Sequence, residues 1–187
     1  GNGQLPGRDD ELFGSAGKGT NRLYGGADAD ADAVAGENGK DVIFGDSEIT
    51  DIAAYIQSSR SEASVNEKGD FLAGAGGDDI LITGAKNDSI EAGDGYHIAW
   101  LGKGNDIYRL TSGEGVDTIL DADGFGYIQW DGFVLSGSKN LAADKWKHPG
   151  DGVWQDLTNN INYILSPQPD GKYQLIIWKG TEKLIVN

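Results

Sequence analysis

Residues 69–110 read GDFLAGAGGDDILITGAKNDSIEAGDGYHIAWLGKGNDIYRL, and this stretch decides the fold. An apolar residue returns at every ninth position, in the order Leu72, Leu81, Ile90, Ala99 and Tyr108. A polar residue stands two positions before each of them, in the order Asp70, Asp79, Asp88, His97 and Asp106. Units that keep one register in this way form an internal repeat, and glycine-rich segments separate them.

A nine-residue period is too short for a helical hairpin and does not match the period of a helix. It fits a turn of about six residues followed by a strand of about three, with the apolar residue at the strand centre pointing inward. The glycines suit the turn, because they allow positive φ and close approach of backbone segments. The repeat therefore predicts an all-β chain.

The Asp that ends each turn also needs an explanation. Glycine and aspartate are common turn formers, which explains a single Gly-Asp turn but not a fixed spacing over successive turns. Tight turns direct main-chain carbonyl oxygens to one place, and carboxylates there complete a cage of oxygens. Such a cage suits Ca²⁺, whereas zinc and copper prefer Cys and His ligands.

These repeats resemble the haemolysin-type calcium-binding nonapeptide repeat of the RTX (repeats-in-toxin) family, with its pattern G-G-x-G-x-D-x-U-x. The resemblance implies a parallel β-roll in which alternate repeats stack. It pairs Asp70 with Asp88, Asp88 with Asp106, and Asp79 with His97. His97 departs from the family pattern, so we expect the site at that position to be weak, altered or empty.

We expect calcium ligands throughout the repeats. In the regular block they are Asp70, Asp79, Asp88 and Asp106, with the turn residues Gly74, Gly76, Gly84, Ala85, Gly93, Gly95, Gly102 and Gly104. A first, degenerate block covers residues 7–46, where the apolar positions are Leu12, Leu23, Val34 and Ile43. The polar positions two residues before them are Asp10, Asn21, Asp32 and Asp41, which we also expect to be ligands. Asp28 and Asp30 are either further ligands or a solvated charged turn.

Residues 47–67 interrupt the repeat and carry apolar residues at helical spacing, namely Ile49, Ile52, Ala53 and Ile56. We expect a short helical insertion that covers the roll, with a partner-binding helix as the alternative. The second block covers residues 68–121, and its last turn, Gly113–Leu120, is looser in register.

Residues 122–187 are expected to form a small antiparallel β region that caps the roll. Asp131-Gly132 predicts a tight hairpin, and strands are predicted over 160–165, 173–178 and 183–186. Residues 136–152 are expected to form a polar loop. This region also looks like the sequence that commonly follows RTX repeats. Its aromatic residues either form the core of the cap or include exposed rings that stack on sugars, for which Trp146 and Trp154 are the candidates.

Composition limits the partners. The 187 residues include 30 acidic and 15 basic side chains, giving a net charge of −15, with 30 glycines and no cysteine. So acidic a surface disfavours nucleic acid and anionic membranes, and no apolar run is long enough to insert into a membrane. Because self-repulsion opposes compaction, we expect a largely disordered chain without calcium and an ordered one with it. Absence of cysteine fits an extracellular protein held together by metal.

No catalytic motif is present, and neither His97 nor His148 has a partner motif, so we expect no enzymatic activity. The resemblance implies a calcium-binding module from a large secreted bacterial protein that is exported by type I secretion and folds outside the cell. Two alternatives stay open. One is an adhesin module that binds carbohydrate or a host surface protein through its aromatic β region, and the other is an appendage that delivers a secreted protease or lipase. The Asp-Pro bond that self-cleaving relatives use is missing, so that activity is not expected.

Overall fold

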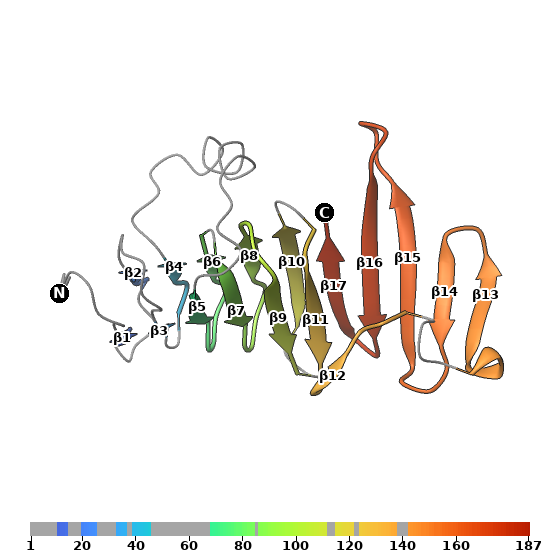
Figure 1. The fold of residues 1–187 in the computed structure, drawn as a ribbon, viewed down its shortest axis with the longest axis horizontal. Coiled ribbons are helices and arrows are strands. Elements are labelled where there is room, and N and C mark those ends of the chain that lie inside the picture. Colours follow the sequence, from blue (N-terminus) through green and yellow to red (C-terminus); the bar gives the residue numbers. More distant parts are fainter. Residues whose placement is uncertain are drawn as a thin grey trace.

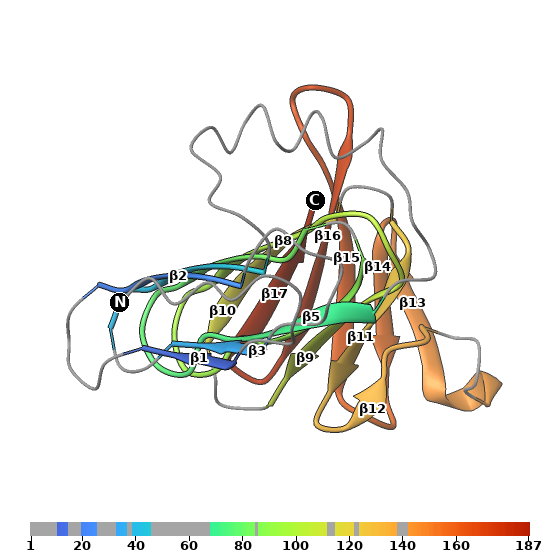
Figure 2. The same cartoon turned by 60° about the vertical axis from the view of Figure 1, so that its left-hand side comes forward.

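The computed structural model describes residues 11–14, 20–25, 33–36, 39–45, 68–84, 86–111, 115–121, 124–137 and 142–187. These residues form two β-sheets, which lie face to face as two layers (Figures 1 and 2). Within the described part of the chain, the single helical element is a 3₁₀ turn at Ala143–Lys145. The all-β prediction is therefore confirmed. The helix expected within 47–67 lies outside the described residues.

Sheet A has seven strands and is parallel except at its last pair. In spatial order the strands are β1 (Glu11–Phe13), β3 (Ala33–Ala35), β5 (Lys68–Ala73), β7 (Asn87–Glu91), β9 (Asp106–Leu110), β11 (Gly126–Trp130) and β12 (Phe133–Val134).

Sheet B has ten strands. Its parallel part runs through β2 (Arg22–Tyr24), β4 (Val42–Phe44), β6 (Ile80–Ile82), β8 (Ile98–Leu101) and β10 (Val116–Asp121). It continues through β17 (Glu182–Val186), β16 (Tyr173–Lys179), β15 (Ile161–Pro167), β14 (Val153–Asp156) and β13 (Trp146–Gly150). From β1 to β11 the chain alternates between the two sheets, so each coil contributes one strand to each layer.

The apolar repeat positions form the core between the sheets. Leu72 lies opposite Ile90 and Ile90 opposite Tyr108 in sheet A, while Leu81 lies opposite Ala99 in sheet B. All five of these side chains are fully buried. The offset of 18 residues in each pair is two nine-residue repeats, as the alternation between sheets requires. The spacing read from the sequence thus sets the register of the stack.

The first, degenerate block obeys the same register. Leu12 lies opposite Val34, and Leu23 lies opposite Ile43. Val34 and Ile43 in turn pair with Leu72 and Leu81, although residues 46–67 separate these strands in the sequence. Both sheets therefore continue across the insertion without a break.

The C-terminal region is joined to sheet B through its final strand. β17 pairs in parallel with β10 on one side and antiparallel with β16 on the other. The hairpin at Asp131-Gly132 is confirmed, with positive φ at both residues and Trp130 opposite Phe133. The polar loop expected over 136–152 is wrong in part, because it contains β13. That strand forms the outer edge of sheet B, where polar side chains and Pro149 are tolerated, so its composition resembles a loop.

The strand pairing also places the two tryptophans that are the candidates for sugar stacking. Trp146 and Trp154 lie within β13 and β14, not in loops, and both are half-buried. Trp146 packs against Tyr163 with ring centroids 5.5 Å apart, and Trp154 stacks on His148 at 5.2 Å. Among the described residues, no helix has the length and apolar character needed to cross a membrane.

Candidate metal centre

Three aspartates from successive coils form a buried column where the chain enters sheet A. Asp70, Asp88 and Asp106 are 2%, 1% and 1% exposed. The main-chain N–H of Asp70 donates to Oδ1 of Asp88 at 2.8 Å, and the N–H of Asp88 donates to Oδ1 of Asp106 at 2.8 Å. The carboxylates of Asp88 and Asp106 thus each tie their own coil to the coil before it. We refer to this column as the all-aspartate edge.

A second column stands on the opposite side, where the chain enters sheet B. The N–H of Asn21 donates to Asp41 Oδ1 at 2.7 Å, and the N–H of Asp41 donates to Asp79 Oδ1 at 2.8 Å. The N–H of Asp79 meets Nδ1 of His97 at 3.2 Å, and the N–H of His97 donates to Asp117 Oδ1 at 3.1 Å. Asn21 is half-buried and the other four residues are buried. We refer to this column as the histidine edge.

The carboxylate of Asp88 is buried where its negative charge is unfavourable. Burial raises its pKa, and the hydrogen bond from Asp70, the Thr83 hydroxyl and Lys86 offset only part of that effect. The second oxygen, Oδ2, is enclosed and accepts no hydrogen bond of ordinary geometry from the described residues. An enclosed carboxylate oxygen of this kind costs free energy unless a cation or a proton neutralises it.

Turn backbones stack closely beside these side chains. A Cβ placed on Gly102 would overlap the carbonyl oxygen of Gly84 one coil earlier, and a Cβ on Gly77 would overlap that of Gly39. Gly77 also has φ of +133°, a conformation that L side chains rarely adopt. Glycine at these places therefore lets main-chain oxygens of successive turns come close to one another and to the carboxylates.

His97 fills the place that an aspartate takes in the other coils. Its Nε2 lies 3.1 Å from the carbonyl oxygen of Gly93, to which an Nε2–H donates. Its Nδ1 lies 3.3 Å from Oδ2 of Asp79 as well as close to the Asp79 N–H. A neutral ring accepts from that N–H, and a protonated ring donates to the carboxylate.

The charge state of His97 follows from these neighbours. Burial by itself lowers the pKa of His97, but the hydrogen bond with Asp79 and the negative charges of Asp117 and Asp79 outweigh it, so the pKa is raised above its ordinary value. The imidazole can thus become an internal cation within the histidine edge.

The predicted ligands separate between the two edges. Gly84, Gly102 and Gly104 lie in turns that lead to the all-aspartate edge, and Gly74, Gly76, Gly93 and Gly95 lie in turns that lead to the histidine edge. Asp10, Asp32 and Ala85 are outside the described residues. Asp117 was missed as a ligand candidate, although it is 2% exposed and in line with the histidine edge. The sequence feature that could have identified it is Gly115-Val116-Asp117, in which the aspartate follows His97 by 20 residues instead of the regular 18.

The candidate metal ligands are mostly oxygen atoms, but among the described residues no three acidic or imidazole side chains converge on one point. In the part of the chain that the structure describes, no group of three or more His, Cys, Asp or Glu side chains could hold a metal ion by itself. An ion at either edge therefore needs main-chain carbonyl oxygens in addition to the carboxylates. Neither models of known protein families nor curated proteins give a match to this chain.

Proposed function

We propose that the chain is a calcium-binding module of the RTX type and that its parallel part is a β-roll. Calcium ions bind between stacked turns, above all at the all-aspartate edge. The observation that carries this proposal is the buried column of Asp70, Asp88 and Asp106, joined coil to coil by main-chain hydrogen bonds, with a raised pKa at its centre.

Calcium suits this column better than other ions do. It takes six to eight oxygen ligands in flexible geometry, and main-chain carbonyls serve it as well as carboxylates. The residues that would hold it are the three aspartates and the glycine-rich turns that precede them. A bound ion would supply positive charge to carboxylates that are otherwise buried at a cost.

The ion would also drive folding. The net charge of −15 opposes compaction, and the free energy of binding at the edges becomes free energy of folding. Because each coil contacts only its neighbours, filling of successive sites should be cooperative.

We propose that the module acts outside the bacterial cell, without catalytic activity, as part of a larger protein exported through a type I channel. A chain that is unfolded where calcium is scarce can pass through such a channel. It would then fold where calcium reaches roughly 10⁻⁴ to 10⁻³ M, a range that suits extracellular sites.

Far-UV circular dichroism tests the proposal. The chain in chelator should show a largely disordered spectrum, and millimolar calcium should convert it to a strand-rich one. Magnesium is the matched control, since it is smaller and requires stricter octahedral geometry, so it should be much less effective. A spectrum that is the same in chelator and in calcium would refute the proposed function.

A further inference from the structure

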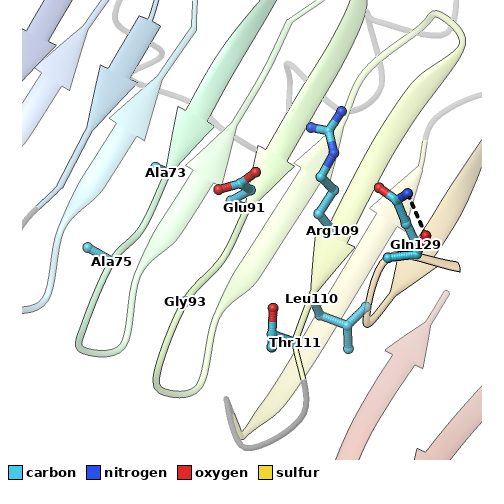
Figure 3. Close-up of a pocket in the computed structure, with 9 residues that line it drawn as sticks. Ala73, Ala75, Glu91, Gly93, Arg109, Leu110, Thr111 and Gln129 are labelled. Carbon is cyan, nitrogen blue, oxygen red and sulfur yellow. Dashed lines mark hydrogen bonds between the residues drawn. The ribbon is translucent and has the colours of Figure 1, made fainter.

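A groove lies on the outer face of sheet A and reaches the first residues of the turns that lead to the histidine edge. Its volume is ≈ 440 Å³. The floor consists of small residues, Ala73, Ala75 and Gly93, and three long polar side chains, Glu91, Arg109 and Gln129, stand along it (Figure 3). These polar residues take no part in the carboxylate columns or in the core.

The strand register places the polar side chains in one row. Glu91 lies opposite Arg109, and Arg109 lies opposite Gln129, on strands β7, β9 and β11. Ala73 on β5 lies opposite Glu91 and extends the row over a flat floor. Four parallel strands at a spacing of about 4.8 Å give a row roughly 14 Å long that crosses the strands.

Apart from Gln129 Nε2, the side-chain hydrogen-bonding groups of the row have no partner among the residues that the structure describes. Among the residues drawn in Figure 3, the one hydrogen bond runs from Gln129 Nε2 to the carbonyl oxygen of Gly132, at 3.1 Å. No ion pair joins the opposite charges of Glu91 and Arg109 in this view, although the two residues are direct cross-strand neighbours. A carboxylate, a guanidinium and an amide oxygen therefore face the groove together.

We propose that this groove binds a neutral oligosaccharide lying across the strands. Vicinal hydroxyl groups of a sugar both donate and accept, which matches a carboxylate that only accepts beside a guanidinium that only donates. Tyr127, two residues before Gln129 on the same outer face of β11, is 38% exposed and offers a ring on which a sugar can stack.

Other ligand classes fit less well. The net charge of −15 repels polyanions such as acidic polysaccharides. An extended peptide binds by adding a strand to a free sheet edge, whereas the backbone groups under this groove are already used in the pairing of β5, β7, β9 and β11. The inference goes beyond calcium binding and does not depend on which edge holds the ion.

The test is calorimetric titration of the full chain, in millimolar calcium, with cello-, malto-, laminari- and manno-oligosaccharides. At least one series should bind, and Arg109→Ala should weaken that binding by roughly tenfold or more, as expected for loss of hydrogen bonds to a charged group. Glu91→Gln should weaken it less, because the amide keeps one acceptor. Lys172→Ala, a change at an exposed residue in the turn between β15 and β16, outside both the groove and the calcium-holding turns, is the control and should leave binding unchanged.

Three results would overturn the proposal. The first is a folded chain, by circular dichroism, that binds none of these sugars. The second is binding that survives Arg109→Ala but is lost in Trp154→Ala, which would place the sugar on the C-terminal strands. The third is competition by unrelated peptides at similar concentration. None of these results bears on calcium-dependent folding, so failure here is distinct from failure of the proposed function.

Discussion

The all-aspartate edge and the histidine edge share one backbone plan, but two positions of the histidine edge, Asn21 and His97, are not aspartates. In both, the residue that ends each turn accepts the main-chain N–H of the corresponding residue one coil earlier, at distances between 2.7 and 3.2 Å. On one side these residues are carboxylates at Asp70, Asp88 and Asp106. On the other side His97 stands between Asp79 and Asp117.

This difference separates the hydrogen bond that the repeated residue accepts from the metal binding that we propose for it. Accepting the main-chain hydrogen bond requires a lone pair at the right place, which an imidazole Nδ1 supplies as well as a carboxylate Oδ1. Holding a cation requires negative charge and a second oxygen, which the imidazole lacks. The stack can therefore continue through neutral His97, whose Nδ1 accepts the Asp79 N–H. Protonated His97 loses that lone pair and instead donates to the Asp79 carboxylate, as an internal positive charge.

The largest effect is expected for Asp88→Asn. The amide oxygen still accepts the N–H of Asp70, but the charge at the centre of the all-aspartate edge is lost. The calcium concentration at the midpoint of folding should rise by roughly tenfold or more, measured by circular dichroism. Asp78→Asn is the matched control, because Asp78 is exposed and lies in a turn of the other edge. Equal midpoints in the two variants would show that the column does not bind the ion.

A second test asks whether the histidine edge depends on close stacking of its turns. Gly77→Ala on the histidine edge forces a methyl group against the carbonyl oxygen of Gly39 and strains a positive φ. Chemical denaturation in calcium should show a loss of about 1–3 kcal/mol in the free energy of unfolding. Gly150→Ala, where a Cβ meets no atom within 4 Å, should change it little. Equal stability of the two variants would mean that the stacking is looser than described.

His97→Asp tests whether a single side chain sets the difference between the edges. The new carboxylate would sit between Asp79 and Asp117, so the chain should bind about one more calcium ion, counted by atomic emission after gel filtration. The matched control is His148→Asp, since His148 lies outside the repeats on β13 and should not change the count. If the count stays constant for His97→Asp, histidine is not what limits metal binding at this edge.

The smallest effect is expected from pH. Burial raises the pKa of Asp88 above 3.8, so the stability contributed by its protonated form is present below 3.8 and lost as pH rises through the raised value. The raised pKa of His97 acts in the same direction, with stability present below 6.5 and lost above the folded value. The calcium-free chain should therefore show more strand signal at about pH 5 than at about pH 8.

The control for this titration is His97→Asn in chelator. Residue 97 cannot change its charge in that variant, so the gain of strand signal on acidification should be smaller than in the unaltered chain. Loss of strand signal at the lower pH in the unaltered chain would contradict the assigned shifts.

The repeat region could be predicted in detail because its information is local. The inward positions from Leu12 to Tyr108 follow from spacing alone, and Asp131-Gly132 carries its own turn geometry. The inward positions of the irregular first block could also be predicted. Extra residues within a turn lengthen the spacing between strands without changing which residue of each strand points inward.

The remainder depends on contacts between distant segments. Nothing near β17 predicts that it pairs with β10, which precedes it by more than 60 residues. β13 has the composition of a loop, because an edge strand tolerates polar residues and proline. The groove on sheet A was also missed, because Glu91, Arg109 and Gln129 are unremarkable in sequence and become neighbours only through the register.

The most direct test of the account is the location of bound calcium in crystals grown with the ion, from its anomalous scattering. If calcium binds as proposed, peaks will lie between the stacked turns beside Asp70, Asp88 and Asp106, with a weaker peak or none beside His97. Absence of any peak along the all-aspartate edge, in crystals of the folded chain at millimolar calcium, would contradict the proposal.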